Sequence, residues 1–479
     1  MTAEAGVFHE PEEFLRGNPE YERTRRLDEL RRTEYGYLDE QGHLYLDYTG
    51  AGLAARSQYR AHEERLAGTL FGNPHSMSPT SEAATDLVER ARARVLRHFN
   101  ADPADHVAIF TANATGAARL VGEAYPFSRK SRLVLTFDNH NSVNGLREFA
   151  RRGHARTTYI PTRAPELRVD TGTLAAELAR GRRGLFAYPA QSNFSGVRHP
   201  LDWIDLARQA GYDVLLDAAA FLPTARLDLS AVHPDFVIAS WYKLFGYPTG
   251  VGCLVARKDT LAKLVRPWFS GGTIQAVSVG MPWHTMAPDE AAFEDGTLNF
   301  LSIPDVQFGL DWLDGIGVEV VGTRVRCLTG WFLARLTALR HGDGSPMVEV
   351  YGPLDTRSRG GTVAFNFLDL DGRVVDERLV ATETSAAGIS LRTGCFCNPG
   401  VGEDAFGLSP NTLRALRHTR TNTLDEYLEL IGLPSAGAIR VSFGLASTVA
   451  DVERFVTFAE HTYRDRVTNV AGLPPRDRC

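Results

Sequence analysis

Lysine stands at only four positions in this chain of 479 residues, and one of them, Lys243, lies in a setting that could do chemistry. It occupies a segment, 239–250, that follows an apolar run ending at Asp217, whereas Lys130, Lys258 and Lys263 have no comparable setting. A lysine amine forms a Schiff base with an aldehyde, and a carboxylate beside a pyridine nitrogen keeps that nitrogen protonated. An opposite charge at about 4 Å contributes up to ~4 kcal/mol at an effective dielectric constant of about 20. The pair therefore indicates pyridoxal phosphate, although each residue alone fits a surface lysine or a helix cap.

A second segment, 110–116, follows an expected strand and precedes an expected helix. Its small residues and a threonine hydroxyl would let backbone amides and the helix N-terminus hold a phosphate group. The same sequence also suits an ordinary helix cap. By itself the segment leaves both interpretations open.

Polar side chains follow two more expected strands. His140 could lie flat on a pyridine ring and exchange protons with it, although a single histidine is usually structural. Gln191 could donate to the phenolic oxygen of the cofactor, and Asn193 could orient a substrate. Amides in loops more often satisfy backbone groups, so this alternative stays open.

The elements that must position these residues alternate between strands and helices. Apolar segments predict seven strands, at residues 107–110, 132–136, 155–160, 185–188, 214–217, 236–239 and 252–256. Apolar strands with helical crossovers indicate a mainly parallel seven-stranded sheet covered on both faces, an α/β fold. Ligands bind such sheets at the loops beyond the carboxyl ends of the strands, where the candidate residues stand.

Three parts of the chain are expected. Residues 1–45 predict an N-terminal arm that packs with a small domain, including a short hairpin around Gln41 and Gly42. Residues 46–305 predict a large cofactor-binding domain, and residues 306–479 predict a connector helix, reaching about residue 340, and a small α+β domain. Strands of that domain are expected at 348–351, 362–366, 389–392 and 438–442.

Composition narrows the classes of protein. The hydrophobic fraction of 43% and the charged fraction of 23% are typical of a globular protein, and the net charge of -6 disfavours nucleic acid as a partner. The chain has no apolar run that could span a bilayer and no signal-like N-terminus, so we expect a cytoplasmic protein without a membrane partner. The five cysteines show no spacing typical of secreted disulfides, so we expect reduced thiols.

The order of these segments resembles the fold-type I pyridoxal phosphate enzymes of the class V aminotransferase and cysteine desulfurase group. Within that group the chain is most similar to the N-terminal sulfurase domain of molybdenum cofactor sulfurases. The matching stretches are Tyr-Leu-Asp-Tyr-Thr-Gly-Ala at 45–51, Gly-Asn-Pro-His-Ser at 72–76, and the segments 136–143, 189–196, 293–300 and 391–400. The resemblance implies a large domain with a mainly parallel sheet and a smaller α+β C-terminal domain.

The resemblance also implies roles for individual residues. Lys243 would form the Schiff base, Asp217 would pair with the pyridinium, His140 would stack on the ring and Gln191 would contact the ring oxygen. Phosphate would be bound by the backbone amide of Ala114 and the side chains of Thr115 and Ser240. Gly296 and Thr297 would reach the phosphate of a neighbouring subunit, which implies a homodimer.

Two arginines and one cysteine complete the implied site. Arg440 would bind the carboxylate of an amino-acid substrate through its planar guanidinium, and Arg392 is a second candidate, with a surface ion pair as the alternative for each. Cys397 matches the cysteine that forms a persulfide in desulfurases. Cys395 and Cys397 also have the spacing of a metal-binding pair, but no second pair of ligands is nearby, and a buried inert cysteine is the stronger alternative.

The chain departs from the sulfurase pattern in two places. The motif 398–400 continues with Val401 and Gly402 instead of Ala-Cys, and the sequence stops at Cys479, before the domain that holds molybdenum cofactor in those enzymes. We therefore expect cleavage of a carbon–sulfur bond in cysteine or an S-substituted cysteine, without transfer to that cofactor. The alternatives are other reactions on an amino acid, namely transamination, epimerisation or decarboxylation-linked oxidative deamination, and a noncatalytic partner protein.

Overall fold

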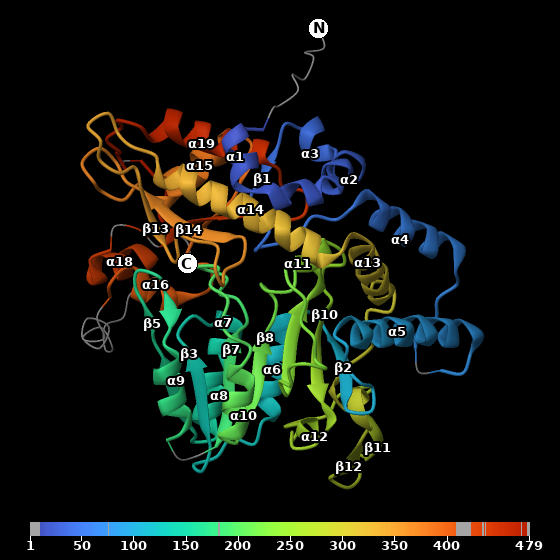
Figure 1. Cartoon of the computed structure of the whole chain (residues 1–479). Coiled ribbons are helices and arrows are strands. Elements are labelled where there is room, and N and C mark those ends of the chain that lie inside the picture. The colour runs from blue at the N-terminus through green and yellow to red at the C-terminus, as the bar shows by residue number, and fades with distance from the viewer. Residues whose placement is uncertain are drawn as a thin grey trace.

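A seven-stranded sheet forms the centre of the larger half of the molecule in a computed structural model (Figure 1). The structure describes residues 10–74, 76–180, 183–408, 423–433, 435, 437–470 and 472–476. The strands lie in the order β2 (His106–Thr111), β10 (Gly252–Arg257), β9 (Phe236–Ser240), β8 (Asp213–Asp217), β7 (Gly184–Pro189), β3 (Arg132–Thr136) and β4 (Arg156–Ile160). β10 is antiparallel to both of its neighbours, and the other pairs are parallel. The predicted α/β fold and its seven strands are confirmed.

Most of the strands are apolar because both faces of this sheet are covered, whereas the edge strand β4 is only partly buried. One face packs against α6 (Ala114–Ala124) and α8 (Leu146–Arg152). The other face packs against α5 (Pro79–His98), α9 (Thr171–Leu178), α10 (Trp203–Gln209) and α13 (Ile303–Ile316). Each fully buried leucine, valine or phenylalanine contributes roughly 1.5–3 kcal/mol relative to an exposed one, so the alternation of strands and helices fixes the layers.

The end of α5 carries a titratable group whose burial makes stability depend on pH. Burial lowers the pKa of His98 to about 4, against the opposing effect of Asp314, from an ordinary value of about 6.5. The folded-state pKa lies below the unfolded one, so the unfolded chain takes up a proton first as the pH falls, and stability is lost between about pH 6.5 and about pH 4.

We expect His98→Gln to remove part of this acid sensitivity. The full shift corresponds to ~3 kcal/mol, an order-of-magnitude figure, and it disappears when the imidazole is removed. Urea unfolding of the wild type and the variant at pH 7.5 and pH 4.5 measures the difference. Equal losses of stability on acidification would show that His98 does not titrate as described.

A four-stranded antiparallel sheet forms the second half, in the order β13 (Val348–Tyr351), β14 (Thr362–Phe367), β17 (Ala438–Ser442) and β16 (Arg392–Gly394). It shares a hydrophobic core with α14 (Val318–Thr337), α19 (Val449–Tyr463) and, from the N-terminal segment, Phe14, Tyr21 and Leu27. These three residues belong to α1 (Glu12–Gly17), η1 (Pro19–Thr24) and α2 (Arg26–Glu34), respectively. The three helices lie beside α14 (Figure 1). The boundaries at residues 46 and 306 stay predictions.

Three local predictions are wrong. The expected hairpin at Gln41 is absent, because residues 37–40 form α3 (Tyr37–Glu40) and β1 (Leu44–Tyr45) pairs in parallel with β15 (Ile389–Ser390), far along the chain. The expected single connector helix is broken into α13 and α14 at Gly317, whose φ of 84° lies outside the helical region. The expected strand 389–392 is likewise divided between β15 and β16.

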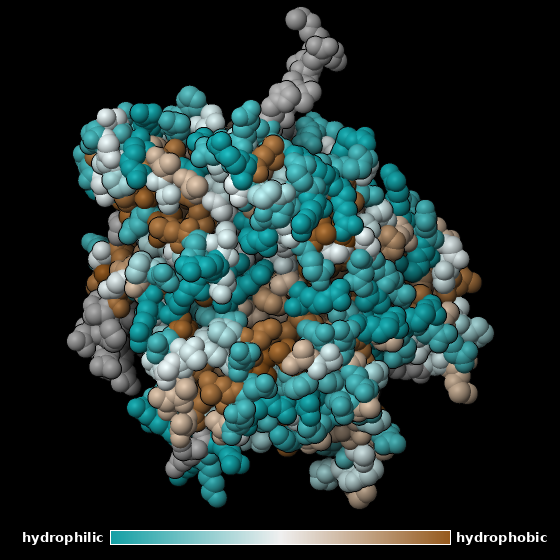
Figure 2. Space-filling model, in the orientation of Figure 1, coloured by the Kyte–Doolittle hydropathy of each residue, from teal (hydrophilic) through white to brown (hydrophobic). Residues whose placement is uncertain are grey.

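The remaining described elements are shorter or lie at the edges. They are α4 (Arg56–Gly68), α7 (Asn141–Asn144), β5 (Thr162–Arg163), β6 (Arg168–Val169), α11 (Trp241–Phe245), α12 (Lys258–Leu261), β11 (Ile274–Ser278), β12 (Trp283–Met286), η2 (Asp289–Phe293), α15 (Glu377–Ala386), α16 (Pro399–Ala405) and α18 (Leu424–Ile431). Within the described part of the chain, no helix is long and apolar enough to cross a bilayer. The face seen in Figure 2 is mostly hydrophilic, with smaller hydrophobic areas between the hydrophilic ones.

Candidate active site

A cavity of about 420 Å³ lies beyond the carboxyl ends of the parallel strands, as expected for this kind of sheet. The loops after β3, β7, β8 and β9 and the start of α6 each contribute to its wall. The structure thereby brings together eight of the candidate residues, which are Ala114, Thr115, His140, Gln191, Asn193, Asp217, Ser240 and Lys243. A volume of this size is typical of sites for cofactors.

Lys243 lies on the wall of this cavity and is half-buried. It stands in α11, a short helix that ends at Gly246, where φ is 80°. Burial lowers the pKa of Lys243, and the negative charge of Asp217 opposes that effect. A lowered pKa increases the fraction of neutral amine, which is the form that attacks a carbonyl carbon.

Asp217 and Gln191 line the same cavity from neighbouring strands. Oδ1 of Asp217 accepts a hydrogen bond from the backbone amide of Ala219 at 3.0 Å, which fixes the carboxylate at the end of β8. Oε1 of Gln191 accepts from Nε of Arg198 at 2.9 Å, so the amide nitrogen of Gln191 is the end left to donate. Arg198 was not predicted from the sequence, because nothing local distinguishes it from the other arginines.

The start of α6 forms the polar end of the cavity. The side chain of Asn113 caps the helix by accepting from the amide of Gly116 at 2.9 Å. The hydroxyls of Thr115 and Ser142 lie 2.6 Å apart, and the amide of Ala114 donates to Oγ of Ser240 at 2.9 Å. A helix N-terminus beside three hydroxyl groups attracts an anion such as phosphate.

His140 is held between the cavity and α7, whose first turn it caps. Its Nδ1 accepts from the amide of Ser142 at 3.1 Å and lies 2.9 Å from the hydroxyl of the same residue. Burial lowers the pKa of His140, and the nearby charge of Lys243 lowers it further. Because Nδ1 accepts from the amide of Ser142, Nε2 carries the proton of the neutral ring and can donate a hydrogen bond to a bound molecule.

The segment with Cys397 is docked beside the cavity. The amide of Asn141 donates to the carbonyl of Cys397 at 2.7 Å, and Nδ2 of Asn193 donates to the carbonyl of Phe396 at 2.8 Å. Nδ2 of Asn398 donates to Oδ1 of Asn193 at 2.8 Å. The side chain of Asn193, which was expected to orient a substrate, therefore makes its hydrogen bonds to this segment.

The segment has an unusual backbone, since φ is 55° at Phe396 and 54° at Cys397. Such values in residues other than glycine cost of order 1 kcal/mol or more each, and they often occur where a side chain is presented for function. The thiol of Cys397 is free and exposed.

The expectation that all thiols are reduced is wrong for Cys395, which is disulfide-bonded, whereas Cys253 and Cys327 are free and buried. The expectation came from spacing along the sequence, which does not report which sulfur atoms the tertiary fold brings together. Cys479 lies outside the described residues.

The two candidate arginines lie side by side on neighbouring strands of the second sheet. The register of β16 and β17 places Arg392 opposite Arg440, and both donate to the carboxylate of Asp47. NH2 of Arg440 lies 2.9 Å from Oδ1, and NH2 of Arg392 lies 2.7 Å from Oδ2. Neither arginine lines the Lys243 cavity itself, but the charge of Arg440 lowers the pKa values of both His140 and Lys243.

Asp47 is a residue that reading the sequence missed. Its place within the segment 45–51, which matches the desulfurase pattern, was the available signal. The sequence does not distinguish Asp47, because carboxylates are common at strand ends and its two arginine partners are distant along the chain.

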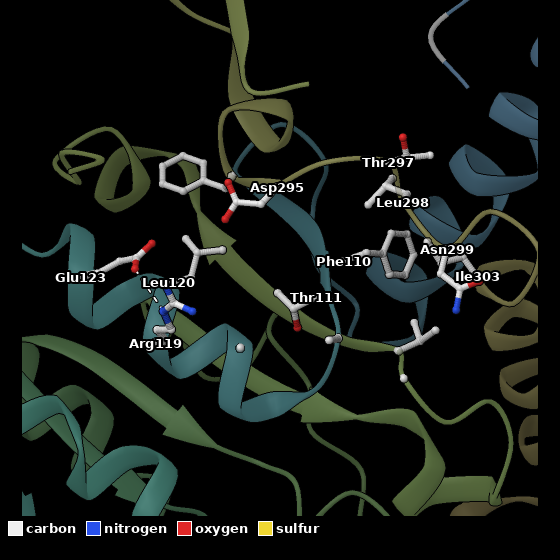
Figure 3. A pocket seen from close by; sticks show the side chains of 15 residues that line it. Phe110, Thr111, Arg119, Leu120, Glu123, Asp295, Thr297, Leu298, Asn299 and Ile303 are labelled. Atoms are coloured by element: carbon white, nitrogen blue, oxygen red, sulfur yellow. Dashed lines mark hydrogen bonds and ion pairs between the residues drawn. The ribbon is translucent and has the colours of Figure 1, made fainter. Parts of the chain in front are cut away.

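Thr297, expected at the phosphate, lines a second cavity of about 350 Å³. This cavity adjoins the first through Ala112 and Gly250, which line both. Figure 3 shows Thr297 on the loop after η2 and, on the opposite side of the view, Arg119 and Glu123 of α6. Within one chain, Thr297 therefore stands next to the Lys243 cavity and not on its wall.

The comparisons with known proteins agree with this geometry. The sequence profile of the Aminotransferase class-V family matches residues 44–455. The molybdenum cofactor sulfurase of Solanum lycopersicum is 36% identical to this chain over 507 residues, a match that covers 98% of this chain and 62% of that protein. The chain thus spans less than two thirds of the length of that relative.

Solved structures show the same fold. The apo structure of a cysteine desulfurase from Thermococcus onnurineus superimposes with a TM-score of 0.75 at 23% identity, covering 91% of this chain and 97% of that chain. The cysteine desulfurase CsdA from Escherichia coli gives a TM-score of 0.71 at 21% identity, covering 91% and 98%. No group of three or more histidine, cysteine or acidic side chains suited to a metal occurs among the residues that the structure describes.

Proposed function

The chain belongs to the aminotransferase class-V family, and from that premise we propose that it cleaves the carbon–sulfur bond of cysteine, with Cys397 receiving the sulfur. The observation that carries this proposal is the docking of the Cys397 segment beside the Lys243 cavity, through Asn141 and Asn193. A free thiol on a segment that is held beside an amine-bearing cavity suits sulfur transfer to the enzyme.

The cofactor of this family is pyridoxal phosphate, and the residues present fit it. Lys243 supplies an amine with a lowered pKa, Asp217 a carboxylate and Gln191 an amide donor. The start of α6 with Thr115 and Ser240 suits the phosphate. When bound, the cofactor withdraws electrons from the amino-acid carbon skeleton.

Lys243 and His140 supply the proton transfers. Burial lowers the pKa of both side chains, which favours the neutral form of each. Their positions on one cavity wall allow a proton to leave the Cα of a substrate and to return to its Cβ. We assign the first transfer to Lys243, because burial lowers the pKa of its amine and its side chain lines the cavity.

Arg440 binds the substrate, and Cys397 removes its sulfur. In this proposal Arg440, which donates to the carbonyl of Asn193, binds the α-carboxylate of the substrate through its guanidinium. The thiolate of Cys397 forms a bond to the substrate sulfur while the bond from Cβ to sulfur breaks. Protonation of Cβ yields alanine, and the sulfur stays on Cys397 as a persulfide.

A second outcome is supported by one observation. Cys397 is exposed and does not line the cavity wall, so an S-substituted cysteine could lose its thiol by β-elimination without it. The products would then be pyruvate, ammonia and a thiol. Incubation of the cofactor-loaded protein with cysteine and with S-methylcysteine, followed by assays of alanine, sulfide, pyruvate and methanethiol, separates the two. Absence of all four products would contradict carbon–sulfur cleavage altogether.

We propose further that the enzyme is a homodimer in which Thr297 completes the phosphate site of the partner subunit. The loop of Thr297 borders a cavity that opens next to the Lys243 cavity. The hairpin β11–β12 projects from the same half of the molecule and exposes Val277, Val279, Met281 and Trp283 (Figure 1). Exposed apolar side chains grouped in this way are typical of an interface.

Complementation between two inactive or weakened chains tests this arrangement. Thr297→Ala should weaken cofactor binding roughly tenfold, because one hydrogen bond to an ionised phosphate is lost. A heterodimer of one Thr297→Ala chain and one Lys243→Ala chain is then purified with two tags. In it, the Lys243→Ala chain supplies its intact Thr297 to the site of the Thr297→Ala chain, which retains Lys243. We expect about half of the wild-type activity with wild-type cofactor affinity. A heterodimer that keeps the weakened affinity would place Thr297 in the site of its own chain.

A further inference from the structure

Two positive charges stand directly opposite each other beside the active site. Arg392 pairs with Arg440 across β16 and β17, an arrangement of like charges that by itself destabilises a sheet. Arg440 is buried, with 4% of its side chain exposed, whereas 52% of the Arg392 side chain is exposed. Burial lowers the pKa of Arg440, and Asp47 opposes that effect.

The carboxylate of Asp47 bridges the two guanidinium groups from a fixed position. Oδ2 accepts from Nε and NH2 of Arg392 at 3.1 and 2.7 Å, and Oδ1 accepts from NH2 of Arg440 at 2.9 Å. The backbone of Asp47 is held by a bridge to Ser442. A Cβ at Gly50 would collide with Oδ2 of Asp47, so only glycine leaves room for the carboxylate there.

Arg440 still has a donor to offer. Its NH1 donates to the carbonyl of Asn193 at 3.1 Å, but its buried Nε has no partner among the described residues. A buried guanidinium nitrogen without a partner is costly, and a ligand carboxylate would satisfy it. The three side chains Arg392, Arg440 and Asp47 together carry one net positive charge, which matches one carboxylate.

We propose that Asp47 makes this site selective for amino acids that carry a single carboxylate, by cancelling one of the two arginine charges and holding Arg440 in place. The proposal rests on the proposed function, in which Arg440 binds the substrate carboxylate. Removing the charge of Asp47 leaves two uncancelled positive charges, which favours a ligand with a second anionic group. Removing the charge of Arg392 leaves no net positive charge, which disfavours a ligand with a second anionic group.

L-Asparagine and L-aspartate test this, because they have nearly the same size and differ by one charge. Their dissociation constants for the cofactor-loaded protein are read from the change in the absorbance of the cofactor, without any need for carbon–sulfur cleavage. We expect the wild type to bind asparagine more tightly. Asp47→Asn should shift the ratio of the two constants about tenfold toward aspartate, and Arg392→Gln should shift it in the opposite direction.

The double variant Asp47→Asn/Arg392→Gln restores one net charge, so its ratio should return to within about threefold of the wild type. Asp39→Asn, which removes an exposed carboxylate paired with Arg31, is the control and should leave the ratio unchanged. A retained cofactor band and thermal unfolding curve show that each variant is folded. Ratios that do not move, or that move in the same direction in both single variants, would overturn the proposal. A wild type without the cofactor band would contradict the proposed function and this inference with it.

Discussion

Lys243→Ala is expected to lower the turnover of cysteine by about a thousandfold or more, because the variant loses both the amine that binds the cofactor and a base at Cα. Lys243 is the one lysine that lines the cavity within the described part of the chain. Lys130, Lys258 and Lys263 do not line this cavity, so none of them substitutes for it. Steady-state production of alanine and sulfide measures the loss.

The same variant gives a test that does not depend on activity. Borohydride treatment of the wild type, followed by peptide mass spectrometry, should fix the cofactor on the Lys243 peptide, and the variant should lack the modified peptide. Lys263→Ala is the matched control, because Lys263 is an exposed lysine that pairs with Asp213 at 2.8 Å. A Lys243→Ala protein with near wild-type turnover, or a cofactor fixed on another lysine, would disprove the assignment.

Cys397→Ala should abolish the formation of alanine from cysteine, with a loss of about a hundredfold or more. The substrate sulfur has no acceptor in the variant. It is therefore not transferred to the enzyme, and the bond from Cβ to sulfur is not broken by this route. The absorbance of the bound cofactor should be unchanged, because Cys397 does not line the cavity wall. Assays of alanine and pyruvate with cysteine and with S-methylcysteine give the result.

The outcome also separates the two proposed reactions. Pyruvate and thiol production that survives in Cys397→Ala would support elimination and contradict the role of Cys397 as sulfur acceptor. Cys327→Ala serves as the control for loss of a thiol, since Cys327 is buried and burial raises its pKa to about 12. Mass spectrometry of the wild type after brief exposure to cysteine should find the added sulfur on the peptide with Cys397.

The sequence alone determined the large sheet and the residues at its carboxyl edge. Seven apolar segments separated by helical patterns predicted β2, β3, β4, β7, β8, β9 and β10 at nearly their observed positions. Local periodicity is sufficient here because a strand covered on both faces must be apolar throughout. Parallel strands direct their following loops to one edge, so the sequence is sufficient to group His140, Gln191, Asp217 and Lys243.

Only the tertiary structure decided how distant segments meet. The pairing of β1 with β15, the bridge from Asp47 to Arg392 and Arg440, and the contact of Arg198 with Gln191 were not predicted. Each depends on atoms brought together by folding, and a sequence of abundant arginines and carboxylates does not specify which of them pair. The chemistry of Lys243 was therefore readable from its neighbours along the chain, whereas the charge that surrounds the substrate was set by register and packing across the two sheets.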